Sequence, residues 1–143
     1  MKAMWGEPMA FFKWNESYSV HVRMCDAQHQ KLIEIINQLA DAMQVGKGAA
    51  VIRETLAQLL RYTQVHFAQE EELMKRAGYT NSAAHQQLHR KLVADIQKFH
   101  QDLEQGGRTN IVAVLDFLKH WLVDHIQKND KAYSGHLNAC GID

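Results

Sequence analysis

The chain has 143 residues, which is enough for one domain with a substantial core and too few to favour two domains. Sixteen basic and sixteen acidic side chains give a formal net charge of zero, so no overall positive field attracts nucleic acid or an anionic membrane surface. The chain has no run of about 18 apolar residues and its first residues do not resemble a signal peptide, so we expect no membrane insertion and a cytoplasmic location.

Glycine and proline punctuate the chain at intervals of roughly 20 to 30 residues, a length suited to the helices of a bundle. Pro8 is the single proline, and the glycines in the body of the chain lie at 46–48, 78, 106–107 and 135. This punctuation predicts an N-terminal arm over residues 1–25 and a short tail over residues 135–143. The predicted helices span about 26–45, 49–77, 82–105 and 109–134. Similar lengths and short connections predict an all-α, antiparallel up-down-up-down four-helix bundle, with residues 1–143 as a single domain.

Capping residues and apolar stripes support these helices. Asp26 is placed to cap the first helix, Asn81 or Ser82 the third, and Thr109 the fourth. When the residues are placed about 100° apart, each helix carries an apolar stripe, and every stripe contains at least one histidine. The inward histidines are His29, His66, His85, His89 and His125.

Three consecutive glutamates in VHFAQEEELM, residues 65–74, point in different directions. With His66 at zero, Glu70 lies at about 40°, Glu71 at about 140° and Glu72 at about 240°, while the apolar stripe is centred near 40°. We therefore expect Glu70 to point into the core and the other two to be solvated. A carboxylate in an apolar core is costly unless it is protonated, paired or bound to a cation. Since no lysine or arginine of the last three helices has an obvious place on the inner faces, a metal ion is the expected partner.

A single inward histidine is more often an ordinary core residue than a metal ligand, but five of them over four helices favour a metal site. The pairs His66/Glu70 and His85/His89 each bring two donor groups to one helix face at neighbouring heights. The remaining histidines are interpreted as structural or surface residues. They are His21 and His136 outside the helices, His120 on an outer face, and His100, about 16 Å from His89 along its helix.

Four segments together resemble the signature of the hemerythrin family, in particular that of its single-domain bacterial members. They are DAQH at 26–29, HFAQEE at 66–71, HQQLH at 85–89 and HIQKND at 125–130. The resemblance extends from about Trp14 to Tyr133. It implies oxygen binding at a non-haem di-iron centre inside a four-helix bundle. The implied cofactor is two iron ions, Fe²⁺ or Fe³⁺, with a bridging oxo or hydroxo group.

The resemblance also implies a role for each site residue. His85, His89 and His125 would bind one iron, His29 and His66 the other, and Glu70 and Asp130 would bridge them. With the bridging oxygen, the first iron then has six ligands and the second has five, which leaves one position for dioxygen. By their place in the family pattern, the residues implied to line a dry oxygen pocket are Leu32, Phe67, Trp121, Leu122 and Ile126. Plain core packing would explain these five equally well.

One spacing departs from a regular helix. Asp130 follows His125 by five residues, which places it about 140° around the helix, whereas Asn129 occupies the i+4 position. Hemerythrins share this five-residue spacing. We therefore predict either a π-bulge between residues 125 and 130 or a ligand that reaches in from the flank.

The predicted function is a non-enzymatic oxygen carrier, store or supplier, with dioxygen as ligand, an oxygen-consuming enzyme as a candidate recipient and a monomer as the default state. The alternatives are a di-iron oxidase or peroxidase, a protein that handles nitric oxide, an oxygen sensor, or a bundle that binds zinc or manganese. Ferritin-like di-iron enzymes rely on Glu and Glu-x-x-His ligands, whereas histidines dominate here. No HExxH sequence occurs, which argues against a zinc protease. Cys25 and Cys140 form no CxxC pair, so two free thiols are expected.

Overall fold

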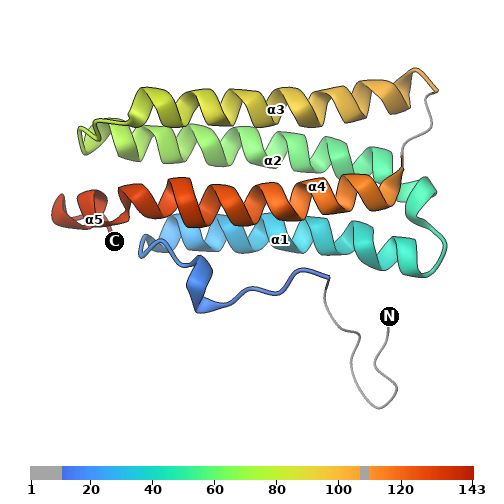
Figure 1. Cartoon of the computed structure of the whole chain (residues 1–143), viewed down its shortest axis with the longest axis horizontal. Helices are drawn as coiled ribbons and strands as arrows, with labels where there is room; N and C mark the ends of the chain where they lie inside the picture. The colour runs from blue at the N-terminus through green and yellow to red at the C-terminus, as the bar shows by residue number, and fades with distance from the viewer. Residues whose placement is uncertain (1–10, 107–109) are drawn as a thin grey trace, which may run out of the picture.

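The computed structural model describes residues 11–106 and 110–143, and the regular structure in these ranges is entirely helical. Its elements are η1 (Glu16–Tyr18), α1 (Arg23–Gln44), α2 (Gly48–Arg76), α3 (Ser82–Glu104), α4 (Ile111–Asp124), η2 (His125–Asp130) and α5 (Lys131–Ala139). The helices α1, α2 and α3 lie side by side with a fourth rod, in which α4, η2 and α5 follow one another (Figure 1). The predicted all-α four-helix bundle is confirmed. None of the described helices combines the length and apolar character that crossing a lipid bilayer requires.

The first helix begins one turn earlier than predicted, at Arg23 instead of residue 26. Asp26 does not cap it. Its carboxylate instead accepts hydrogen bonds from the Ser19 hydroxyl at 2.7 Å and the Val20 amide at 2.8 Å. The prediction was wrong because Asp26 satisfies donors of the preceding loop, which fastens the end of the arm to the first turn of α1.

The other helix ends follow local backbone chemistry. Gly46 and Gly78 have φ values of +75° and +65°, a conformation that suits glycine at the end of a helix. The side chain of Asn110 caps α4 by accepting the amide of Ala113 at 3.2 Å, while the predicted cap, Thr109, lies outside the described residues. Asn81 precedes α3 without making a side-chain cap bond.

The predicted tail is wrong in part, because the fourth rod continues as α5 to Ala139 instead of ending at Gly135. His136, which was expected outside the helices, lies within α5. Its Nε2 meets the carbonyl of Ala77 at 2.6 Å and so ties α5 to the end of α2. Gly135 does not end the helix, because its own backbone is not in the left-handed conformation. The glycine with that conformation is Gly141, with φ of +82°, and α5 ends just before it, at Ala139.

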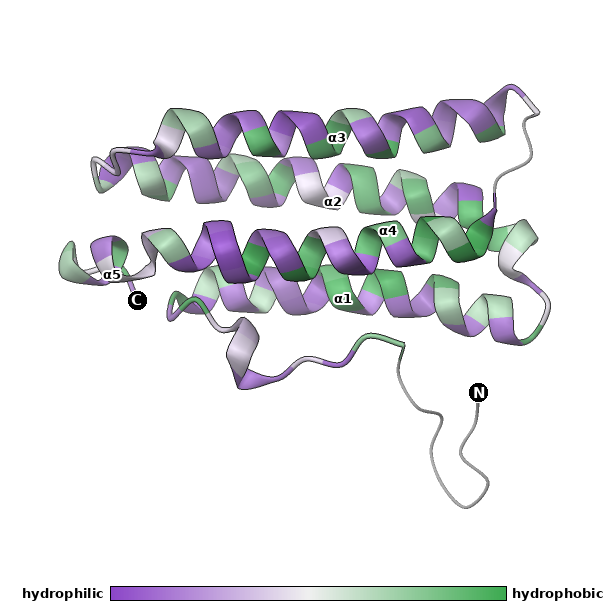
Figure 2. Ribbon diagram, in the orientation of Figure 1, coloured by the Kyte–Doolittle hydropathy of each residue, from purple (hydrophilic) through white to green (hydrophobic). Residues whose placement is uncertain are grey.

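Apolar side chains from all four rods form the core. Figure 2 shows hydrophobic and hydrophilic residues alternating along each rod, as expected of amphipathic helices. The most deeply buried apolar residues include Leu32, Ile35, Leu39, Leu56, Leu59, Leu92, Ile96, Leu115 and Leu118. Burial of this apolar surface is the main force that holds the bundle together.

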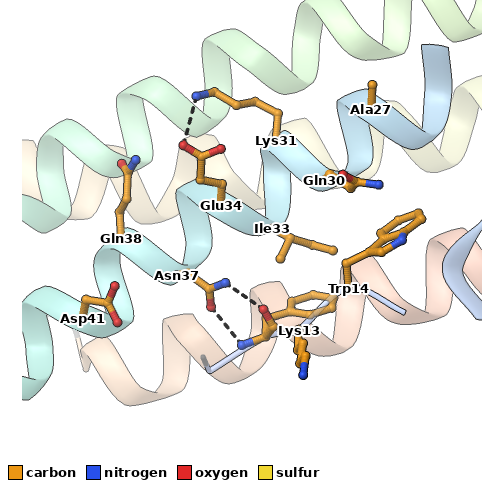
Figure 3. A pocket seen from close by; sticks show the side chains of 11 residues that line it. Lys13, Trp14, Ala27, Gln30, Lys31, Ile33, Glu34, Asn37, Gln38 and Asp41 are labelled. Carbon is orange, nitrogen blue, oxygen red and sulfur yellow. Dashed lines mark hydrogen bonds and ion pairs between the residues drawn. The ribbon is translucent and has the colours of Figure 1, made fainter. Parts of the chain in front are cut away.

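The described part of the N-terminal arm is fastened to the bundle. The amide group of Asn37 accepts the backbone N–H of Phe12 at 2.8 Å and donates to its carbonyl at 2.7 Å. Lys119 of α4 donates to the carbonyl of Phe11 at 2.9 Å. Figure 3 shows the open surface groove that results between the arm and α1, with Trp14 and Ile33 among its lining residues.

Candidate metal centre

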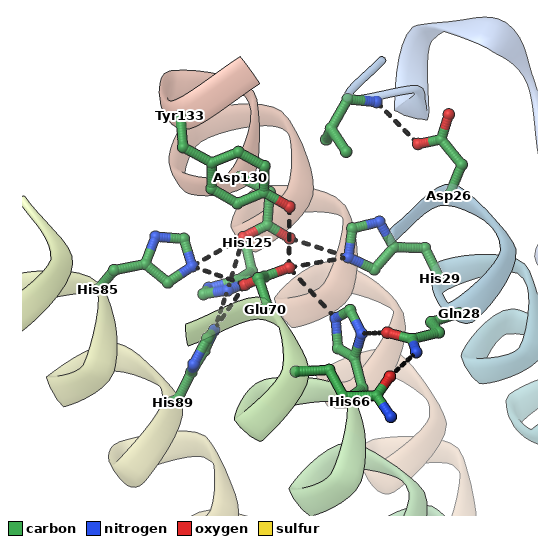
Figure 4. Close-up of polar contacts among 12 residues, drawn as sticks. Asp26, Gln28, His29, His66, Glu70, His85, His89, His125, Asp130 and Tyr133 are labelled. Carbon is green, nitrogen blue, oxygen red and sulfur yellow. Dashed lines mark hydrogen bonds and ion pairs between the residues drawn. The ribbon is translucent and has the colours of Figure 1, made fainter. Parts of the chain in front are cut away.

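Seven buried side chains from all four rods converge on one point of the interior (Figure 4). They are His29 of α1, His66 and Glu70 of α2, His85 and His89 of α3, and His125 and Asp130 of η2. They form two groups whose donor atoms lie within 4.8 Å of one another: His85, His89, His125, Glu70 and Asp130 in one, and His29, His66 and Glu70 in the other. The structure therefore brings together all seven residues singled out in the sequence, divided into three histidines and two.

The two carboxylates each reach toward both groups of histidines. Oε1 of Glu70 lies 2.9 Å from Nε2 of His85, and Oε2 lies 3.3 Å from Nε2 of His66. Oδ1 of Asp130 lies 3.1 Å from Nε2 of His125, and Oδ2 lies 3.0 Å from Nε2 of His29. Each carboxylate thus turns one oxygen toward each side of the cluster, which is the arrangement needed to bridge two cations.

Local helical geometry places these groups. On α2 and α3 the four-residue spacing stacks His66 with Glu70 and His85 with His89 on the inner face. On the fourth rod, residues 125–130 form a turn of π-helix, so the structure has the first of the two predicted alternatives, the π-bulge. This wider turn brings Asp130 onto the face of His125, and Asp130 is fully buried while Asn129 remains partly exposed.

Burial and mutual contact shift the protonation equilibria of the cluster. Burial alone would lower the pKa values of His29 and His85, but the close approach of the Asp130 and Glu70 carboxylates outweighs it and raises both to about 9. For His66 burial prevails, and its pKa falls below the ordinary value. Burial also disfavours ionised Glu70 and Asp130, yet the surrounding histidines hold both carboxyl pKa values below the usual range. The cluster therefore contains two carboxylates and balances them with protons on histidine.

Several buried polar atoms of the cluster have no hydrogen-bond partner among the described residues. They are both ring nitrogens of His29, Nε2 of His66, and both carboxylate oxygens of Asp130. His29 Nε2 and Asp130 Oδ2 lie within ion-pair distance, but their orientation does not make a hydrogen bond. Buried polar atoms are rarely left unsatisfied in native proteins. Imidazole nitrogen and carboxylate oxygen are suitable donors for iron and similar first-row metals, so the residues fit a pair of such ions.

Three further side chains contact the cluster from outside, and the sequence did not point to them. Oε1 of Gln28 meets Nδ1 of His66 at 2.6 Å, and a carboxylate oxygen of Glu71 meets Nδ1 of His89 at 2.7 Å. The hydroxyl of Tyr133 donates to Oε2 of Glu70 at 2.9 Å.

These contacts correct one prediction. Glu71 was expected to be solvated, but its side chain is only 28% exposed and it pairs with His89, whereas Glu72 is exposed as predicted. The sequence did contain a sign of this contact: Glu71 lies about 140° from His66 on the helix, and a residue on the flank can reach the neighbouring helix. The roles of Gln28 and Tyr133 depend on which elements pack together, so no spacing revealed them.

An apolar cavity adjoins the cluster. It is lined by Leu32, Ile36, Leu59, Thr63, Ile96, Leu118, Trp121 and Leu122, and its volume of ≈ 10 Å³ is close to that of one water-sized sphere. Three of the five predicted pocket residues, Leu32, Trp121 and Leu122, line this cavity. Phe67 and Ile126 do not line it, although both are buried.

Aromatic rings also enclose the cluster. Phe67 stacks on His89 with the ring centres 3.7 Å apart, and Trp121 stacks on His125 at 5.0 Å. His89 and His125, two members of the three-histidine group, therefore each lie against a flat aromatic ring, which restricts their rotation.

Comparisons with known proteins agree with this geometry. Residues 20–137 match the family described as the hemerythrin HHE cation binding domain. The chain is 34% identical to a bacteriohemerythrin of Pseudomonas aeruginosa (strain LESB58) over 87% of this chain and 80% of that protein. It is also 34% identical to a bacteriohemerythrin of Methylococcus capsulatus (strain Bath) over 92% of this chain and all of that protein. A crystal structure of wild-type hemerythrin, 31% identical, superposes with a TM-score of 0.83 over 90% of this chain and 98% of that chain. The chain belongs to the hemerythrin family.

Proposed function

We propose that the chain holds two iron ions between these seven side chains and binds dioxygen reversibly, as a carrier, store or supplier of oxygen and not as an enzyme. The observation that carries the proposal is the unequal donor set: three histidines on one side, two on the other, and two carboxylates that reach toward both. His85, His89 and His125 would hold one ion, and His29 and His66 the other. The side with fewer histidines is the one with room for a ligand.

A pair of ferrous ions supplies the two electrons that reversible dioxygen binding requires. The protein's own task is to orient the donors and to keep water, anions and protons away from them. The cavity supports this role, because its lining is aliphatic and aromatic apart from Thr63, and the Thr63 hydroxyl donates to the carbonyl of Leu60 at 3.0 Å. Leu32 lies one turn beyond His29 on α1, Thr63 lies one turn before His66 on α2, and Leu122 lies one turn before His125 on the fourth rod. The cavity therefore lies about one helical turn from the cluster.

The decisive experiment is a cycle of oxygenation. The purified, iron-loaded protein is reduced without air, oxygen is admitted while the visible spectrum is recorded, and the oxygen is then swept away with argon. A charge-transfer band that appears with oxygen and disappears with argon, with recovery of the ferrous state, is the expected result. Rapid and irreversible oxidation would instead favour a di-iron oxidase or peroxidase. No band at a full complement of two iron ions per chain would contradict oxygen binding.

A further inference from the structure

The outer ring nitrogens of the five clustered histidines differ in their hydrogen-bond partners. Within the described part of the chain, Nδ1 of His66 and Nδ1 of His89 are the two that meet another side chain. The partner of His66 is the neutral amide of Gln28, and the partner of His89 is the carboxylate of Glu71. One histidine on each side of the cluster is thus held by a polar side chain, but only one of these side chains is charged.

The polar contacts of both partners indicate which ring nitrogen of each histidine carries the proton. The amide nitrogen of Gln28 donates to the side-chain oxygen of Gln69, which leaves the Gln28 oxygen to face His66. His66 must then carry its proton on Nδ1 and offer Nε2 to the interior. A carboxylate can only accept, so the contact with Glu71 imposes the same tautomer on His89.

The charge of Glu71 is directed at His89. Among the described residues, no lysine or arginine lies within ion-pair distance of Glu71, and His89 is its one such partner. Its side chain is 28% exposed, so solvent screens part of its field, whereas His89 is almost fully buried. A carboxylate that accepts the outer proton of an imidazole makes the inner nitrogen a stronger donor to a metal. A neutral amide holds the ring in place with a much smaller effect on its basicity.

We propose that Glu71 and Gln28 make the two halves of the centre electronically unequal, so that the three-histidine position holds a trivalent ion better than the two-histidine position does. This inference rests on the proposed di-iron function and concerns how its two ions are tuned. Glu71 is a positioning residue that acts through His89, and Gln28 acts through His66. A glutamine at position 71 could hold the ring of His89 in place as Gln28 holds that of His66, so the carboxylate of Glu71 adds a negative charge that holding the ring does not require.

The zinc-loaded protein gives a first test that does not depend on oxygen binding. Proton–nitrogen correlation NMR of the histidine rings reports the tautomer through the nitrogen shifts and the strength of the hydrogen bond at Nδ1 through the shift of its proton. In Glu71→Gln the Nδ1 proton of His89 should shift upfield while the tautomer is kept, and both zinc ions should still bind at saturating metal. In the matched control Glu72→Gln, one residue along and exposed, the His89 signals should not move. Loss of a zinc ion in Glu71→Gln would show that Glu71 merely holds the ring, which overturns the electronic role.

The second test is the reduction potential of the iron-loaded protein, measured by titration with redox mediators. Glu71→Gln removes a charge and should shift the potential of the centre upward. Gln28→Glu adds a carboxylate beside His66 and should shift it downward, and Glu72→Gln should leave it unchanged. Equal potentials in the wild type and Glu71→Gln would overturn the inference even if oxygen binds reversibly. If the shifts occur but oxygen does not bind reversibly, the tuning stands and the oxygen-carrier function fails.

Discussion

The hydroxyl of Tyr133 donates a hydrogen bond of 2.9 Å to Oε2 of Glu70, and both side chains are fully buried. Burial and the charge of Glu70 raise the pKa of Tyr133 well above its ordinary value, so the phenol remains a donor at physiological pH. Oε2 is also the oxygen that faces His66 and His29. Tyr133 therefore helps to fix the orientation of Glu70, and the carboxylate is held ready to face both groups of donors.

Glu70 and Glu72 provide a matched pair for testing the position of the metals. Glu70→Gln keeps the shape of the side chain but removes the charge that two cations share, so we expect the variant to bind fewer than two iron ions per chain. Glu72→Gln should bind as much iron as the wild type because Glu72 is exposed. Iron determination on both purified variants checks this. The same iron content in both would remove Glu70 from the site.

Because of the π-helical turn, we expect iron binding to require the second carboxylate at residue 130 and not at residue 129. Asp130→Asn should lower the iron content because the buried side chain then lacks the negative charge that faces both groups of histidines. Adding Asn129→Asp to this variant should not restore binding, because residue 129 is partly exposed and lies off the inner face. Recovery of two iron ions in the double variant would show that the fourth rod can adopt a regular α-helix with residue 129 at the metals.

Leu122 is expected to protect the oxygenated protein. Leu122→Ala enlarges the cavity beside the cluster and admits water and anions, so autoxidation should become faster. The rate is measured from the loss of the oxygen band with time. Leu115→Ala is the control, since Leu115 is as deeply buried but does not line this cavity. Both substitutions should destabilise the fold by about 2–5 kcal/mol. Equal autoxidation rates in the two variants would make Leu122 an ordinary core residue.

The metal-free protein should lose stability as the pH rises above neutrality. The pKa values of His29 and His85 are raised from 6.5 to about 9, so their contribution is fully present below pH 6.5 and is lost as the pH approaches 9. The lowered pKa of His66 acts in the opposite direction only near pH 6.5, where the unfolded histidine still binds protons. Thermal unfolding between pH 6.5 and 9 should therefore show a falling Tm.

The metal-loaded protein is the control for this pH dependence. Bound metal replaces the protons on the histidines, so its Tm should vary less over the same range, and the stabilisation by metal should grow with pH. A constant Tm of the metal-free protein from pH 6.5 to 9 would mean that these two histidines are not held as cations by Asp130 and Glu70.

Much of the architecture is encoded in short-range patterns that can be read without a structure. The four-residue spacings and the apolar stripes depend only on helix geometry, which is why Glu70 could be distinguished from Glu72. The five-residue spacing of His125 and Asp130 likewise predicted either a π-bulge or a ligand from the flank, because a regular helix would place Asp130 off the inner face. The structure decided for the π-helical turn. Helix ends were less predictable, as Asp26 and Gly135 show, because they depend on which nearby donors and acceptors become available.

The sequence by itself determined the helical class, the inward set of histidines and the irregular spacing of His125 and Asp130, since each follows from the rotation and rise per residue along one helix. The tertiary structure alone decided which groups meet across helices: Glu71 with His89, Gln28 with His66, Tyr133 with Glu70, and the residues around the cavity. The physical reason is that the relative height and rotation of packed helices are set by the fit of all their side chains at once. A partner on another helix therefore has no fixed spacing in the chain.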